Sequence, residues 1–249
     1  MKVLKIGGSI LTDKVRASAV RQDAILRVAQ EIASSPENMV LVHGAGSFGH
    51  IPAQKYGLPH SFNPEGLWVT HRSVARLNDL MVEALCEAGV HALPVHPFSS
   101  LVLRDGRIDS FNLEPIFQML QNGLMPVLHG DVAMDLTRKA GIVSGDQLVP
   151  YLARAFGADV AAVGCDVDGV LFQGHALPLI TRHTLHEIDC ELGGSAGVDV
   201  TGGMKGKLLE LLDLADRGIE SVIFNASKNG NISRALQGEP VGTRVGRSN

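Results

Sequence analysis

The sequence predicts an α/β protein, an αβα sandwich built around a mainly parallel open sheet. Short β-branched or apolar runs alternate with longer segments of helical periodicity, and this order favours parallel strands covered by helices on both faces. Glycine-rich turns directly follow several of the runs, as is typical of strand-to-helix connections in such sheets. With 249 residues, 45% of them hydrophobic, the chain is long enough to bury a full core.

Six runs are predicted as strands from their β-branched and apolar content. They are residues 3–6, 39–42, 92–95, 125–128, 160–163 and 221–224. Four helices are predicted from apolar residues at helical spacing and from glycine stop signals. They cover residues 19–33 with Ser18 as N-cap, residues 69–88, a segment that begins near 145–146 and includes Phe156, and a segment that follows Lys207 to Ala215.

Asp105-Gly106 lies between two apolar runs, and this dipeptide favours a tight turn between antiparallel strands. A hairpin is therefore expected within the α/β series. The sequence shows no repeat, no low-complexity tract and no clear linker, so residues 1–249 are expected to form a single domain. A change in the character of the motifs places approximate lobes at 1–157 and 158–249.

The composition favours small-molecule partners in a reducing compartment. A net charge of −4 without any run of lysine and arginine argues against a nucleic-acid surface. No stretch approaches the roughly 18 apolar residues that span a bilayer, so no membrane partner is expected. The three cysteines are widely spaced and contain no C-x-x-C pair, which excludes a disulfide framework and predicts a cytoplasmic protein.

Four glycine-rich turns hold many of the lysines, at residues 5–9, 43–50, 129–131 and 201–207. Glycine lets the backbone approach an anion and aim its N–H groups at it, and an adjacent lysine adds positive charge. The first three turns each follow a predicted strand. Because ligands of open α/β sheets bind at the carboxyl ends of strands, these turns predict a phosphate site there.

Two familiar phosphate motifs do not fit. Gly44, Gly46 and Gly49 match the spacing of the dinucleotide fingerprint, but no strand ends in an acidic residue about 20 positions later. The turn at 201–207 differs from the P-loop in its glycine spacing and has Leu208 where the P-loop serine or threonine would bind magnesium. Neither a Rossmann dehydrogenase nor a P-loop enzyme is therefore predicted.

The ordered motifs together resemble the amino acid kinase superfamily. They are Lys5-Ile6-Gly7-Gly8-Ser9, Gly44-Ala45-Gly46, Ser144-Gly145-Asp146, Asp166-Val167-Asp168-Gly169 and Thr201-Gly202-Gly203-Met204, followed by Gly206-Lys207. Thr12-Asp13-Lys14, Gly46–His50 and Asp199–Gly203 make the chain most similar to the isopentenyl phosphate kinases. The resemblance implies phosphorylation of a prenyl monophosphate by ATP with Mg²⁺, in isoprenoid biosynthesis, and usually a homodimer. It also implies that lobe 1–157 binds the acceptor and lobe 158–249 the nucleotide.

Residue roles follow from the same resemblance. It implies catalytic roles for Lys14, Lys5, His50 and Asp146. It implies nucleotide contacts for Lys5, Gly7, Gly8, Ser9, Gly46, Asp166, Gly203 and Lys207. It implies acceptor contacts for Ala45, Gly46, His50 and Gly145. Magnesium is expected on substrate phosphates and water, with no protein-only metal site. Asp131 and Asp168 are further candidates for nucleotide or magnesium contacts or for turn caps, and His71, His91, His96, His183 and His186 are expected to be structural or surface residues.

The organic part of the acceptor is predicted to be apolar. No arginine lies in or beside the turn at 43–50 to meet a carboxylate, although Arg72 and Arg76 on the helix at 69–88 leave this open. Candidate wall residues are Phe48, Leu77, Met81, Val132 and Ile142; the stripe on the helix fits a core face at least as well. The alternatives are a fosfomycin-type kinase, less favoured acetylglutamate or aspartate kinases, and a catalytically silent nucleotide-binding sensor.

Overall fold

The computed structural model of the chain describes residues 1–35, 38–58, 60–192 and 203–247. The strands are β1 Lys2–Ile6, β2 Met39–His43, β3 Ala92–Pro94, β4 Leu101–Arg104, β5 Arg107–Phe111, β6 Met125–His129, β7 Asp131–Asp135, β8 Lys139–Val143, β9 Val160–Cys165, β10 Leu171–Phe172, β11 His175–Ala176, β12 Leu179–Ile180, β13 Glu220–Asn225 and β14 Thr243–Val245. The helices are α1 Gly8–Leu11, α2 Gln22–Ala33, α3 Gly46–Lys55, α4 Pro64–Glu87, α5 Pro97–Ser100, α6 Glu114–Gln121, α7 Gly145–Phe156, α8 Arg182–Leu192, α9 Gly203–Ala215 and α10 Asn231–Leu236.

The main sheet has eight strands in the order β12-β14-β13-β9-β1-β2-β6-β3. All neighbouring pairs are parallel except β13 and β14, which are antiparallel. All six predicted strands are present in this sheet, with ends that differ by one or two residues. The mainly parallel open sheet predicted from the sequence is confirmed. Because β1, β2, β6 and β9 run the same way, their carboxyl ends meet at one edge.

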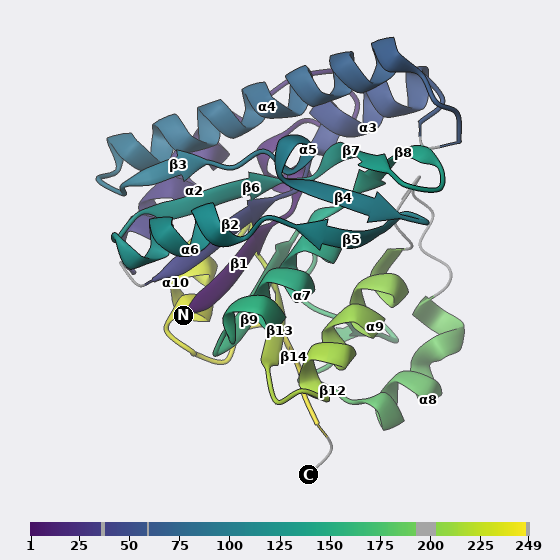
Figure 1. Cartoon of the computed structure of the whole chain (residues 1–249). Coiled ribbons are helices and arrows are strands. Elements are labelled where there is room, and N and C mark those ends of the chain that lie inside the picture. The colour runs from purple at the N-terminus through teal and green to yellow at the C-terminus, as the bar shows by residue number, and fades with distance from the viewer. Residues whose placement is uncertain (36–37, 59, 193–202, 248–249) are drawn as a thin grey trace.

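Helices cover both faces of the main sheet and give it two cores (Figure 1). Successive residues of a strand point to opposite faces, and β1 shows the alternation clearly. Val3 packs in the core shared with α7 and α9, whereas Leu4 and Ile6 pack in the core shared with α2 and α4. The αβα sandwich is therefore built as the sequence predicts, and residue 5 is directed to the α7 face.

A second sheet has four strands in the order β5-β4-β7-β8. β4 and β5 form the predicted hairpin, and both turn residues have positive φ, 51° at Asp105 and 77° at Gly106. β7 and β8 form another hairpin that the sequence did not reveal. This second hairpin begins at Asp131 and so places the residues after β6 in a strand, where only a turn was expected.

Two predicted helix starts differ from the structure. Ser18 is not an N-cap. It has φ 52° and lies in the loop that the bridge between Thr12 and Val20 closes. Helix α2 begins only at Gln22. The helix expected from residue 69 begins at Pro64, where Asn63 accepts a hydrogen bond from the N–H of Gly66 and proline occupies the first turn. The bridge between Thr12 and Val20 delays the start of α2, whereas the cap at Asn63 sets the start of α4.

Among the described residues, none of the helices combines the length and the apolar character that a bilayer crossing requires. The late glycine turn is described only from Gly203 onward, so Thr201, Gly202 and the preceding Asp199 lie outside the described residues.

Candidate active site

Three glycine turns lie side by side at the carboxyl edge of the main sheet. They follow the adjacent parallel strands β1, β2 and β6. The N–H of Gly44 donates to the carbonyl of Ile6 at 2.9 Å, and the N–H of Gly130 donates to the carbonyl of His43, also at 2.9 Å. The structure therefore joins the predicted turns at 5–9, 43–50 and 129–131 into one continuous rim.

The first two turns are in direct backbone contact, which requires glycine. A Cβ atom on Gly8 would lie 2.3 Å from the nitrogen of Gly46, and one on Gly44 would lie 2.5 Å from the nitrogen of Gly8. Gly46 also has φ +51°, in the left-handed region that favours glycine. Since α3 begins at Gly46, N–H groups of its first turn lie at this junction, where the end of a helix favours an anion.

Lys5 is the buried cation of the site. Its side chain follows that of Val3 to the α7 face, where Nζ lies 2.6 Å from Oδ1 of Asp146. Burial lowers the pKa of Lys5, Asp146 opposes this effect, and the charge of Lys207 lowers the pKa further. Burial alone would raise the pKa of Asp146, but the charges of Lys5 and Lys207 outweigh it. The Lys5–Asp146 ion pair, from β1 and α7, thus lies within the electrostatic influence of Lys207 from α9.

Lys14 lies on the loop between α1 and α2 and reaches the strand next to β1. Its Nζ is 2.7 Å from Oδ2 of Asp166, the residue directly after β9, with side-chain exposures of 67% and 39%. Burial would raise the pKa of Asp166, but the Lys14 ammonium lowers it. The loop is tied to the glycine turns because Thr12 accepts a hydrogen bond at 3.1 Å from the N–H of Ser47. Lys14 therefore lies at the seam between the two predicted lobes.

Lys228 is a charged residue of this edge that sequence reasoning missed. It follows β13, and its Nζ lies 2.7 Å from Oδ1 of Asp168. Asn225, the last residue of β13, donates to the same oxygen at 2.9 Å. The signal was present in the sequence, since Lys228 follows a predicted strand within four residues, but no glycine motif marked it.

The remaining predicted residues border the same edge. Gly145 begins α7 against Lys5, whose Cε would be 3.1 Å from a Cβ there. Ser9 hydrogen-bonds to Asp166, and Gly203 begins α9 with φ +65°. His50 lies one turn into α3 and is exposed. The structure thus gathers the sequence-predicted residues around one edge of the sheet.

A small apolar cluster lies beside the rim, where α3, α4, β7 and β8 meet. Its buried members are Ala53, Leu58, Leu67, Val132 and Ala140, and Tyr56, Phe98 and Ile142 pack against them. This cluster contains two of the predicted wall residues, Val132 and Ile142. Phe48, Leu77 and Met81 instead belong to the main core beneath the sheet, where they are 0–2% exposed.

Most of the chain matches a known family model. A model of the amino acid kinase family matches residues 1–225. The chain belongs to the amino acid kinase family.

Relatives within the amino acid kinase family carry a common name. The chain is 36% identical to the isopentenyl phosphate kinase of Methanocaldococcus jannaschii, with 98% of both chains covered. It is 40% identical to that of Haloferax volcanii, with 98% of this chain and 97% of the relative covered. A structure described as an isopentenyl phosphate kinase superimposes with a TM-score of 0.85 at 34% identity, over 98% of this chain and 99% of the other.

Two polar contacts involve residues of α4. Asp131, expected as a nucleotide, magnesium or capping residue, is buried and accepts a hydrogen bond from His71 at 3.0 Å. It is therefore held by α4 and lies apart from the contact between Asp166 and Lys14. Arg72, which left the acceptor's chemistry open, stacks on the ring of Trp68 at 5.0 Å, and both side chains are exposed on α4. The guanidinium of Arg72 is thus engaged with Trp68 on the solvent-exposed side of α4.

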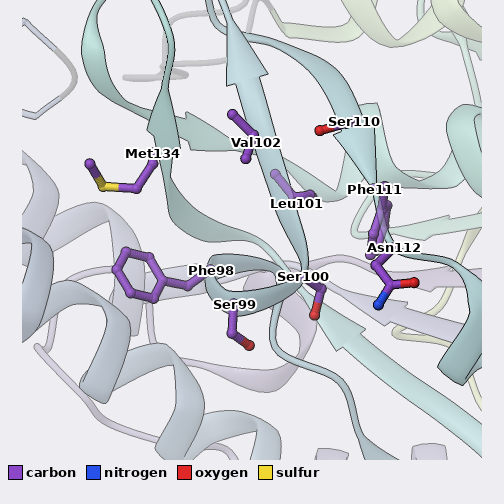
Figure 2. A pocket seen from close by; sticks show the side chains of 9 residues that line it. All are labelled: Phe98, Ser99, Ser100, Leu101, Val102, Ser110, Phe111, Asn112 and Met134. Atoms are coloured by element: carbon purple, nitrogen blue, oxygen red, sulfur yellow. The ribbon is translucent and has the colours of Figure 1, made fainter.

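A surface pocket between α5, β4 and β5 lacks the charged residues of the rim. Figure 2 shows Phe98, Ser100 and Phe111 among the residues that line it. Its lining contains serine, apolar and asparagine side chains and no charged residue. The pocket therefore offers no charge to an anion, and Phe98 is shared between this pocket and the apolar cluster.

Three carboxylates at this edge form ion pairs with lysines. Asp146, Asp166 and Asp168 pair with Lys5, Lys14 and Lys228 respectively. Within the described ranges no group of three or more His, Cys, Asp or Glu side chains is placed to hold a metal ion. The edge as built is complementary to anions, and a divalent cation would need oxygen ligands from a bound phosphate chain.

Proposed function

We propose that the chain transfers the γ-phosphoryl group of ATP to isopentenyl phosphate and forms isopentenyl diphosphate, a step of isoprenoid biosynthesis. The observation that carries this proposal is the meeting of Lys5, Asp146 and Lys207 with the glycine rim at one edge of the sheet. Full-length similarity to isopentenyl phosphate kinases at 36–40% identity supports the same activity.

In this reaction an oxygen of the acceptor's phosphate forms a bond to the γ-phosphorus as the bond to the ADP oxygen breaks. Catalysis of such a transfer rests on alignment and on stabilising charge at the migrating group. Lys5 is suited to lie between the two phosphates because Asp146 holds it in place despite burial. Lys207 would bind the nucleotide phosphates. Lys14 would break its ion pair with Asp166 and stabilise the migrating group.

The acceptor's own phosphate is proposed to bind the backbone of Ala45, Gly46 and Gly145 and the side chain of His50. Both α3 and α7 begin here, so their first-turn N–H groups favour an anion. Its carbon chain would then lie against the apolar cluster of Ala53, Leu58, Leu67, Val132 and Ala140. A short prenyl chain fits this surface, since the cluster offers apolar contact without a carboxylate-binding arginine.

ATP is the co-substrate, and Gly7, Gly8, Ser9, Asp166 and Gly203 complete its proposed site. Magnesium would arrive on the phosphate chain and supply additional charge neutralisation there. A homodimer and a cytoplasmic location, with no nucleic-acid or membrane partner, complete the proposal, together with acceptor and nucleotide lobes at 1–157 and 158–249.

The test is turnover with Mg-ATP and a panel of isopentenyl phosphate, dimethylallyl phosphate, geranyl phosphate, fosfomycin, acetylglutamate and UMP. ADP release and product mass are measured for each acceptor. The proposal expects the highest kcat/KM with isopentenyl phosphate. Preference for fosfomycin would assign a phosphonate acceptor, and nucleotide binding without turnover of any acceptor would indicate a silent sensor.

A further inference from the structure

A buried histidine lies directly before the central turn of the glycine rim. His43 is the last residue of β2, and it is fully buried. Its Nδ1 lies 3.1 Å from the carbonyl oxygen of Gly44, and its Nε2 lies 3.0 Å from the side-chain amide of Asn78 on α4. The ring therefore links α4 to the first residue of the turn at which the acceptor's phosphate is proposed to bind.

The contact with Gly44 requires a hydrogen on Nδ1, because a carbonyl oxygen can only accept. Burial lowers the pKa of His43, which favours a neutral ring with a single hydrogen. Nε2 is then an acceptor, and a half-turn of the Asn78 amide presents its NH₂ group to it. The N–H of Gly44 is held as well, since it donates to the carbonyl of Ile6 at 2.9 Å. Both backbone polar groups of Gly44 are therefore fixed, one by β1 and the other by the ring.

The carbonyl of Gly44 belongs to the same rigid peptide unit as the N–H of Ala45. In a planar trans peptide these two groups point in opposite directions. A ring that holds the Gly44 carbonyl therefore directs the N–H of Ala45 away from the buried imidazole. Ala45 is one of the backbone donors proposed for the acceptor's phosphate. If this peptide turned over, it would present an acceptor oxygen to the anion in place of a donor.

The adjacent strand repeats the arrangement. His129 ends β6 in register with His43, and the two rings stack with their centroids 5.7 Å apart. Nδ1 of His129 lies 3.1 Å from the carbonyl oxygen of Gly130, and its Nε2 lies 3.0 Å from Nδ1 of His96. The peptide after Gly130, however, carries the N–H of Asp131, which begins β7. Of these two rings, His43 is therefore the one that acts on a proposed phosphate donor.

We propose that His43 is a positioning residue whose Nδ1–H holds the Gly44 carbonyl and thereby aims the N–H of Ala45 at the acceptor's phosphate. The inference rests on the proposed function, because it concerns the phosphate of that acceptor. Since the ring is buried, it acts through this peptide and not by contact with the substrate. Loss of the ring should weaken acceptor binding far more than nucleotide binding, whose proposed contacts lie mainly at β1, β9 and α9.

The test compares three replacements of His43. Leucine removes the donor, asparagine places an amide N–H near the position of Nδ1, and glutamine places one near that of Nε2. We expect His43→Leu to raise the KM for isopentenyl phosphate roughly tenfold and to change the Kd for ATP little. His43→Asn should restore most of the loss and His43→Gln little of it. A matched control is Leu85→Ala, a buried core position on α4, which should lower stability and leave both constants unchanged.

An unchanged KM in folded His43→Leu, or an equal rise in the KM for the acceptor and the Kd for ATP, would overturn the inference. Equal rescue by asparagine and glutamine would do the same. If the variants do not fold, the NMR spectrum of the wild type labelled with ¹⁵N-histidine decides the matter. We expect the hydrogen of His43 on Nδ1, and a hydrogen on Nε2 alone would overturn the inference. Failure of the proposed function is distinguishable, because the wild type itself would then not convert isopentenyl phosphate.

Discussion

Asp146→Asn should destabilise the protein strongly because it leaves Lys5 buried without its counterion. Lys5 is 6% exposed, and its Nζ lies 2.6 Å from the carboxylate that the variant removes. Asparagine keeps the size of the side chain and one acceptor oxygen, so the change is almost purely one of charge. Lys207 aggravates the loss, since its charge already lowers the pKa of Lys5.

The magnitude follows from the separation and the burial. Two unit charges about 2.6 Å apart interact by about 6 kcal/mol at an effective dielectric constant of 20. The remaining amide hydrogen bond and partial loss of the Lys5 proton offset part of this. We therefore expect the free energy of unfolding to fall by about 3–5 kcal/mol at pH 7, as is usual when one partner of a buried pair is removed.

Urea unfolding at pH 7 and pH 9.5 measures the effect and its cause. The unfolded state binds a proton at Lys5 up to about pH 10.4. A folded state with a lower pKa at Lys5 is penalised below that pH, so the deficit of the variant should shrink as the pH rises. Asp159→Asn, which removes an exposed partner of the N-terminal ammonium, is the control and should change stability far less. A loss below about 1 kcal/mol, or a deficit independent of pH, would refute the reasoning.

Four further outcomes are expected. Lys14→Ala should lower kcat while leaving the Kd for ATP nearly unchanged, because its charge acts on the migrating group; unaltered kcat in a steady-state assay would remove it from that role. His50→Ala should raise the KM for the acceptor far more than the Kd for ATP, and equal damage to both would place it at a shared phosphate. Met81→Ala should cost about 2–5 kcal/mol in urea unfolding without a change in acceptor preference, since Met81 is core; improved use of geranyl phosphate would contradict this. Burial lowers the pKa of His43 and of His129, so stability should fall below about pH 6.5 by roughly 1.4 kcal/mol per pH unit for each, and a flat profile from pH 7 to 5 would count against it.

The fold was predictable because its signals are local. Each main strand is a short apolar run that must be buried on both faces, and the turn at Asp105-Gly106 needs positive φ at both residues, which this dipeptide accepts. The start of α2 was not predictable in the same way. Ser18 carries the right residue type for a cap, but the bridge between Thr12 and Val20 keeps the chain extended until Arg21.

The site was predictable to the extent that it consists of motifs. Lys5 and Asp146 belong to recognisable turns, and their contact follows from the packing of α7 on the face of β1 to which residue 5 is directed. The pairing of His71 with Asp131 joins α4 to β7 across 60 positions, and no spacing in the sequence marks it. The candidate wall residues fall into two different clusters for a similar reason. Met81 and Val132 are both apolar, and only the packing of α4 shows that Met81 faces the core.

The stacking of Arg72 on Trp68 has a practical consequence for spectroscopy. Trp68 is the single tryptophan of the chain, and it lies on α4 between Leu67 of the apolar cluster and the turn that carries His71. Its indole emission therefore originates from the exposed side of α4 alone, next to the apolar cluster. If the acceptor binds as proposed, it lies nearer to this indole than the nucleotide, whose proposed contacts are at β1, β9 and α9, so the unlabelled protein can report the two ligands separately.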